Sequence, residues 1–233
     1  MATLEARTRN RTSVPPSYRR YWLALYRRDV ASAERIVAGA ARQWPPQRVY
    51  LRLFEPALAL SGTLWERGRI THHDEHFVTH HTLRLMRRVR RSFVPAETFG
   101  PLAVATGVGQ ESHLIGLKMV CDFLRWAGWR VHWLSSNDRA VVADVVGRLR
   151  PDALLLSIGR DAGVAPAARM VADLRRRGYA GTVAVGGRAV NLDPSVVDRV
   201  GADLTAPNAA AFVRAVRVRF PRTGRCRRAD AEA

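Results

Sequence analysis

Residues 102–116 read LAVATGVGQESHLIG. The run 102–106 is apolar and has the length of a buried strand, glycines follow at Gly107 and Gly109, and a helical pattern begins at Leu114. A strand that enters a helix through a glycine turn is the first half of a βαβ unit. This stretch therefore predicts the start of an α/β domain.

The residues after this stretch repeat the same alternation. Further strand-like runs lie at 130–134, 153–157, 182–185 and, more weakly, 202–205, and helical patterns lie at 114–127, 138–149, 164–177 and 207–219. Right-handed crossovers then require a five-stranded parallel sheet with helices on both faces. Ligands of such sheets bind at the carboxyl ends of the strands, so we expect the chemistry in the loops after the first, third and fourth strands.

The residues before this stretch are helical in pattern. Helices are predicted near 17–28, 29–43, 46–67 and 72–93, with Asp29 and Thr71 as N-caps. Four helices with short connections pack as an antiparallel bundle. We therefore expect a bundle over 17–93, an α/β domain over 101–219, a flexible lead-in over 1–16 and a basic tail over 220–233.

The chain is strongly basic, with a formal net charge of +18 over 233 residues and Lys118 as its single lysine. Such a field attracts nucleic acid, anionic lipid or an acidic protein. The alternative is a compositional bias carried on solvated helix faces, because the arginines are dense only at 84–91 and 222–228. Cys121 and Cys226 indicate no disulfide framework, and no apolar run is long enough to cross a membrane, so we expect a cytoplasmic protein.

Polar and small residues follow three of the predicted strands. Glu111-x-His113-x-x-Gly116 follows the first strand, Ser157 ends the third, and Gly186-Gly187 follow the fourth. The glycines of the first loop do not have the spacing of a dinucleotide-binding turn. Taken alone, a histidine in such a loop is either a ligand or a structural cap.

Together these residues resemble the cobalamin-binding domain, a flavodoxin-like and Rossmann-like fold found in methionine synthase, corrinoid carrier proteins and mutases. The resemblance covers residues 101–219. It implies that His113 is the lower protein ligand to cobalt, and that Glu111 accepts the other ring N–H of this histidine. Glu111 stands where aspartate is commoner in the family.

The resemblance also assigns the other small residues. Gly116 would leave space for the nucleotide tail of cobalamin, Ser157 would bond to its buried base, and Gly186 with Gly187 would let the backbone approach the tail. Gly159 stands where the Ser-x-Leu pattern of the family has leucine, so the resemblance implies looser packing around the nucleotide tail at this position.

A second motif lies in the helical part, where Trp65 is followed after nine residues by Glu75-His76. This W-x9-E-H pattern resembles cobalamin photoreceptors, in which a helical cap shields the adenosyl group on the upper face of the corrin. The histidine that follows the tryptophan in those photoreceptors is Glu66 here, which puts a bis-histidine adduct through this position in doubt. Residues 1–16 are too few for the DNA-binding domain that usually precedes such a cap.

The photoreceptor-like arrangement also resembles photocobilins, which carry a bilin beside cobalamin. Biliverdin would bind non-covalently, with its propionates on arginines of the fourth helix, namely Arg84, Arg87, Arg88 and Arg91, and its rings near the histidines of that helix, namely His72, His73, His76, His80 and His81. The alternative for this cluster is a metal site, because His72, His76 and His80 share one helix face.

These observations lead to a hypothesis of function. We expect a non-enzymatic, light-responsive signalling protein that binds adenosylcobalamin through cobalt, and acts as a homodimer with a protein output partner. A corrinoid methyl carrier for a methyltransferase is the alternative. A nucleic-acid-binding module that uses the arginine-rich helix is a third class, and it depends on charge alone.

Overall fold

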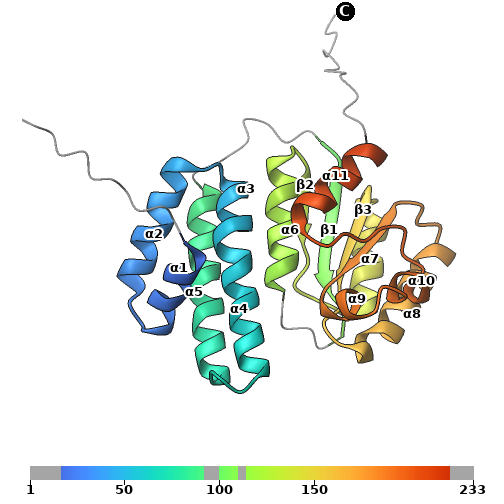
Figure 1. The fold of residues 1–233 in the computed structure, drawn as a ribbon. Coiled ribbons are helices and arrows are strands. Elements are labelled where there is room, and N and C mark those ends of the chain that lie inside the picture. The colour runs from blue at the N-terminus through green and yellow to red at the C-terminus, as the bar shows by residue number, and fades with distance from the viewer. Residues whose placement is uncertain (1–16, 92–99, 110–113, 221–233) are drawn as a thin grey trace, which may run out of the picture. The chain divides into compact units, whose positions relative to one another are not determined.

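The computed structural model describes residues 17–91, 100–109 and 114–220. The chain divides into two compact units, the first ending at Phe93 and the second beginning at Val94 (Figure 1). Each unit is described by itself.

Unit 1 is entirely helical over its described residues. Its elements are α1 (Tyr18–Tyr26), α2 (Val30–Gln43), α3 (Pro46–Val49), a π-helical turn η1 (Tyr50–Phe54), α4 (Glu55–Glu66) and α5 (His72–Arg91). The four predicted helices are therefore present, and the third is divided by the π turn. The predicted N-caps are confirmed: Asp29 accepts the Ser32 N–H at 2.9 Å, and the Thr71 hydroxyl accepts the Asp74 N–H at 3.1 Å.

The core of unit 1 is built on large aromatic side chains. Tyr21, Tyr50 and Phe54 are completely buried. Both tyrosines keep their hydroxyls bonded to α5, Tyr21 to the Thr82 hydroxyl at 2.8 Å and Tyr50 to the Met86 carbonyl at 3.1 Å. Because a buried hydroxyl without a partner is costly, these bonds tie α1 and η1 to one position on α5.

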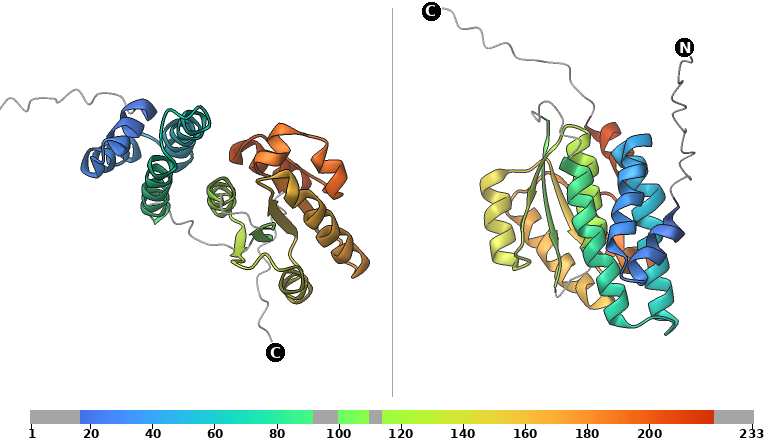
Figure 2. Two further views of the ribbon diagram at one scale, coloured as in Figure 1. Left: turned by 90° about the horizontal axis from the view of Figure 1, so that it is seen from below. Right: turned by 90° about the vertical axis from the view of Figure 1, so that its left-hand side faces the viewer.

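Unit 2 is a parallel sheet between helices. The strands β1 (Leu102–Gly107), β2 (Arg130–Trp133), β3 (Ala153–Ser157) and β4 (Thr182–Gly186) lie in the order β2-β1-β3-β4. The helices are α6 (Ile115–Trp126), α7 (Arg139–Leu149), the short 3-10 turn η2 (Asp161–Gly163), α8 (Val164–Arg176), α9 (Arg188–Leu192), α10 (Val196–Val200) and α11 (Ala209–Arg219). The pair α6 and α11 and the pair α7 and α8 cover opposite faces of the sheet (Figure 2).

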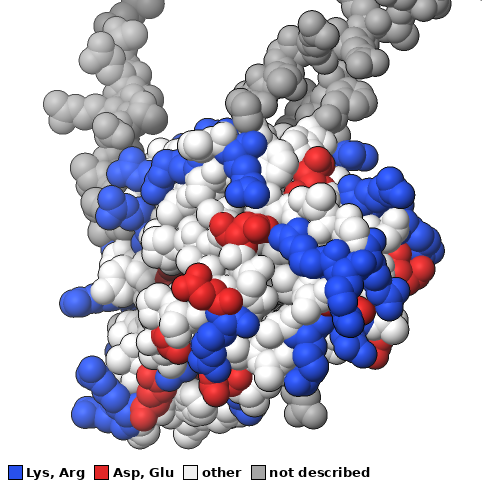
Figure 3. Space-filling model, turned by 90° about the vertical axis from the view of Figure 1, so that its right-hand side faces the viewer, with Lys and Arg blue, Asp and Glu red and all other residues white. Residues whose placement is uncertain are grey.

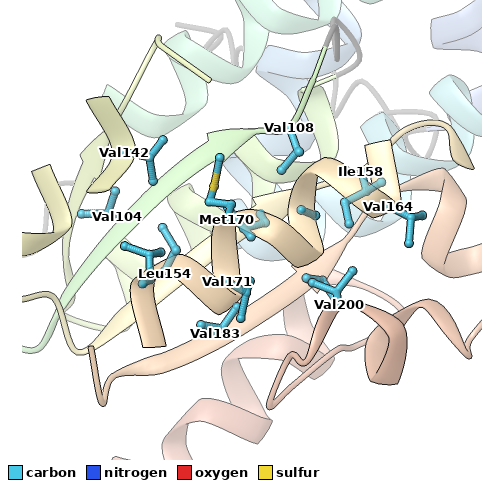
Figure 4. Close-up of a cluster of buried hydrophobic side chains, with 14 of the residues drawn as sticks. Val104, Val108, Val142, Leu154, Ile158, Val164, Met170, Val171, Val183 and Val200 are labelled. Carbon is cyan, nitrogen blue, oxygen red and sulfur yellow. The ribbon is translucent and has the colours of Figure 1, made fainter. Parts of the chain in front are cut away.

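The core of unit 2 consists of aliphatic side chains. Val104, Leu154 and Val183 from three neighbouring strands are fully buried, and they lie with Met170 and Val171 of α8 in one cluster (Figure 4). Branched aliphatic residues on a parallel sheet that is covered on both faces are the expected pattern. The α/β prediction is confirmed.

The predicted fifth strand at 202–205 is wrong. Within the described residues this segment makes one isolated parallel bridge, Ala184 to Leu204. The Asp203 carboxylate accepts the Val183 N–H at 2.7 Å and also pairs with Arg175 at 2.6 Å. A side chain thus occupies part of the edge of β4, and the short helices α9 and α10, which were not predicted, precede this segment.

None of the described helices is both long enough and apolar enough to cross a bilayer.

Candidate functional site

Small residues lie at the carboxyl edge of the sheet in unit 2, and we call Gly107, Ser157 and Gly186 the shelf. Strand register places Gly107, Ser157 and Gly186 side by side at the ends of β1, β3 and β4. The Val108 N–H donates to the Ser157 carbonyl at 3.0 Å, and the Ile158 N–H donates to the Gly186 carbonyl at 2.8 Å. The backbone therefore holds the shelf rigidly, and Ser157 lies between two residues without side chains.

The glycines predicted for the site differ in what surrounds them. Among the described residues, a Cβ built at Gly116 or at Gly186 would meet no atom within 4 Å. At Gly187 a Cβ would lie 2.5 Å from the Ile158 carbonyl oxygen, and φ is +103°. Gly187 is therefore required by a contact between two backbone segments of the protein itself, whereas Gly116 and Gly186 leave room for a ligand.

The predicted cobalt ligand His113 and its partner Glu111 lie outside the described residues, so their roles stay predictions. The described beginning of their loop is held by the segment between β2 and α7. The Thr106 hydroxyl donates to the Ser136 carbonyl at 2.9 Å, and the Asn137 side-chain amide donates to the Gly109 carbonyl. Ser136 and Asn137 were not predicted from the sequence, because only the tertiary fold places this segment beside the loop after β1.

The three residues of the W-x9-E-H motif come together on the surface of unit 1 with His72. The Trp65 and His72 rings are 6.0 Å apart, and the His72 and His76 rings are 3.8 Å apart. The His76 Nδ1 lies 2.7 Å from a Glu75 carboxylate oxygen, and the Thr79 hydroxyl donates to the other oxygen at 2.7 Å. We call Trp65, His72, Glu75 and His76 the cap cluster.

Exposure shows that the cap cluster is not part of the core of unit 1. Trp65 is 44 % exposed, and the His76 side chain is 55 % exposed. Large aromatic side chains normally bury most of their surface. The cluster thus leaves an indole and two imidazoles exposed on unit 1, with the Glu75 carboxylate, 15 % exposed, held beside His76.

The metal site considered for the histidine cluster finds no support in the described residues. No three histidine, cysteine or acidic side chains among them lie close enough to hold a metal ion, so His72, His76 and His80 do not form the metal site considered from the sequence. Cys121 is buried, and burial raises the pKa of its thiol to about 12, so this thiol does not suit covalent attachment of a bilin.

The histidines further along α5 lie in a positive environment. His81 contacts Phe77 at 4.2 Å between rings and His80 at 5.5 Å. Burial lowers the pKa of His81, and the neighbouring charge of Arg84 lowers it further. Both effects favour the neutral form of the His81 imidazole.

Comparison with family models gives matches in both units. Residues 101–215 match the model described as B12 binding domain, and residues 18–90 match a second model with the same description. The shelf at the sheet edge fits the nucleotide tail of this cofactor, since a flat base needs a slot between small residues and Ser157 supplies a hydroxyl.

Solved structures with a similar fold include three corrinoid or cobalamin proteins. A monomethylamine corrinoid protein from Methanosarcina barkeri aligns with a TM-score of 0.74 and 18 % identity over 85 % of this chain and 96 % of that chain. At this identity the likeness shows a common fold. A cobalamin-binding protein from Desulfitobacterium hafniense DCB-2 aligns at a TM-score of 0.48, with 19 % identity over 85 % of this chain and 96 % of that chain.

The third of these structures is the methanol:cobalamin methyltransferase complex from Methanosarcina barkeri, with a TM-score of 0.47 and 17 % identity over 85 % of this chain and 77 % of that chain. Among curated protein sequences, no significant match was found.

Proposed function

Because this chain carries a B12 binding domain, with a matching family model in each of its units, we propose that it is a light-responsive cobalamin protein without catalytic activity of its own. In this proposal His113 is the lower ligand to cobalt, and Glu111 accepts its second ring N–H. The nucleotide tail lies over the shelf, beside Gly116, Ser157 and Gly186. The cap cluster contacts the upper axial group.

The observation that carries the proposal is the exposed cap cluster. An adenosyl group offers an adenine ring and ribose hydroxyls, which suit an exposed indole and a carboxylate that is already oriented. Glu75 is held by the Thr79 hydroxyl and by His76, so little further ordering of this carboxylate is needed on binding. A methyl group offers neither an aromatic face nor a hydrogen bond to these side chains.

The response to light would follow from the surroundings of the adenosyl group. Adenosylcobalamin supplies a cobalt–carbon bond that visible light breaks. Trp65 and Glu75 touch the adenosyl group in the dark and no longer do so after it departs. Such a difference in interactions between two states is what shifts a conformational equilibrium of the protein.

A corrinoid methyl carrier is the second candidate, and the comparison with solved structures favours it more directly than it favours a light response. The structure with the TM-score of 0.74 is described as a monomethylamine corrinoid protein, and it is covered almost along its whole length. In this candidate the helical unit covers a methyl group, and a methyltransferase is the partner.

One experiment tests the proposal and separates the two candidates. The intact chain is loaded with adenosylcobalamin or methylcobalamin in the dark and desalted, and absorption spectra are recorded before and after green light. We expect retention of adenosylcobalamin and a permanent spectral change that is accompanied by altered hydrogen exchange in α4 and α5. Preferential retention of methylcobalamin, without any change in exchange after illumination, would establish the carrier instead.

The lower ligand is tested in the same assay by His113→Ala, with His132→Ala as the matched control on β2. We expect the first variant to lose cobalamin on desalting or to change its dark spectrum, and the control to match the unaltered chain. If His113→Ala retains the same affinity and spectrum, the ligand assignment is wrong.

A further inference from the structure

Several of the arginines described in unit 2 pair with neighbouring carboxylates. Arg148 pairs with Asp144 at 2.7 Å, and Arg176 pairs with Asp173 at 3.1 Å. Arg177 also reaches Asp173, at 3.3 Å. On the face in Figure 3 the basic side chains are accordingly interspersed with acidic ones.

The end of α5 is different. Arg84, Arg87, Arg88 and Arg91 follow one another at helical spacings of three and four residues. We call these four residues the arginine row. Among the described residues, the carboxylate that an arginine of the row reaches is Glu34, at 3.4 Å from Arg88.

The arginines of the row are close enough on α5 to repel one another, and few carboxylates among the described residues offset this repulsion. Residues three and four apart are neighbours on a helix surface, and like charges at this spacing destabilise the helix. The dipole of the helix favours positive charge in the last turn, which accounts for Arg88 and Arg91. It does not account for Arg84, which lies two turns from the end of α5.

The surface around the row indicates what kind of ligand it suits. The four arginines line a common hollow, and arginine is the one residue type among its described lining residues. Guanidinium groups pair with phosphate oxygens, so four arginines spaced along one hollow suit a linear array of anions.

We propose that the arginine row is a docking surface for the phosphate backbone of duplex nucleic acid. The row extends over seven residue steps, from Arg84 to Arg91, or roughly 10 Å at about 1.5 Å per residue. One strand of a duplex presents a phosphate about every 3.4 Å along the axis, so three phosphate steps match this length. The net charge of +18 adds a field that attracts such a polyanion from a distance. The inference does not depend on cobalamin binding.

The test compares two variants of the intact chain that carry the same charge. R84Q/R87Q/R91Q removes three arginines of the row, and R148Q/R176Q/R177Q removes three arginines of unit 2 that have acidic partners. Each lowers the formal net charge by 3, from +18 to +15. Fluorescence anisotropy with a labelled DNA duplex of mixed sequence is measured between about 50 and 200 mM salt. Circular dichroism confirms that both variants remain folded.

We expect the row variant to bind the duplex more weakly and the slope of log affinity against log salt to fall by about 2.7, or about 0.9 for each phosphate that is no longer neutralised. The control variant should keep most of the slope. Equal losses of affinity in the two variants, or no binding by the unaltered chain, would overturn the inference. So would stronger competition by polyglutamate than by unlabelled duplex, or retention of biliverdin that depends on the row while duplex binding does not.

Discussion

The two units use side-chain size in opposite ways. In unit 1 the fold depends on large buried residues such as Tyr21 and Phe54, and the candidate site depends on a large residue, Trp65, that is left exposed. In unit 2 the candidate site depends on residues with little or no side chain, Ser157 and Gly186, that stand at the ends of buried strands. We therefore expect a smaller side chain at Trp65 to impair the site in unit 1. In unit 2 we expect a larger side chain at Gly186 to impair the site.

The comparison also separates residues that serve the fold from residues that leave room for a ligand. Gly186 and Gly187 are adjacent, and the sequence assigns them the same role. In the structure a Cβ at Gly187 would meet the backbone of Ile158, whereas one at Gly186 would meet no described atom within 4 Å. Substitutions at these two glycines test this distinction, and changes at Trp65 and Asp74 test the residues of unit 1.

Gly187→Ala should have the largest effect on stability. Its Cβ would lie 2.5 Å from a backbone oxygen at a φ of +103°, and the backbone cannot adjust without moving the residues that follow β3. We expect a loss of about 3 kcal/mol in the free energy of unfolding of unit 2, measured by urea denaturation. A change of only a few tenths would show that this close approach is absent in solution.

Gly186→Val should leave unit 2 folded and abolish or weaken cobalamin binding. Valine is favourable in a strand, and no atom of the described residues lies within 4 Å of the Cβ position. Its side chain would fill the space that we assign to the nucleotide tail, and we expect an affinity loss of about tenfold to a hundredfold. Equilibrium dialysis measures the affinity, and thermal unfolding checks the fold. An unchanged affinity would place the tail elsewhere.

Trp65→Ala should change ligand preference with little effect on stability. Because the indole is 44 % exposed, we expect the free energy of unfolding to change by less than about 1 kcal/mol. Stacking of a base on an aromatic ring contributes about 1–3 kcal/mol, so adenosylcobalamin affinity should fall roughly tenfold to a hundredfold. Hydroxocobalamin, which lacks the adenosyl group, is the control ligand. Equal losses of affinity for the two ligands would assign Trp65 to packing alone.

Acid should weaken unit 1 through the cap of α5, and this effect should be the smallest. The Thr71 hydroxyl and N–H, with a smaller contribution from Arg28, lower the pKa of Asp74. A lowered pKa stabilises the folded state at pH values above the pKa of the unfolded chain, and this stability is lost as pH falls through the lowered value. Thermal unfolding from about pH 6 to about pH 3 should show a decline that Asp74→Asn reduces.

Much of the fold could be predicted because its signals are local. The N-caps Asp29 and Thr71, the helical periods of unit 1 and the apolar runs of β1, β3 and β4 each depend on neighbours within a few residues. The fifth strand failed because its pairing is decided by Asp203, whose carboxylate bonds across to Val183. No local pattern shows that a side chain will take a position at a sheet edge.

The sequence by itself determined the alternation of strands and helices, the cobalamin motif around Gly116, Ser157 and Gly186, and the W-x9-E-H spacing, since each is a matter of residue type and distance along the chain. Only the tertiary structure decided that Gly187 is required by Ile158, that Trp65 is exposed beside His72, and which arginines of unit 2 have carboxylate partners. These properties depend on distances between residues that are remote in sequence. Burial and charge pairing are set by those distances, which periodicity and spacing do not specify.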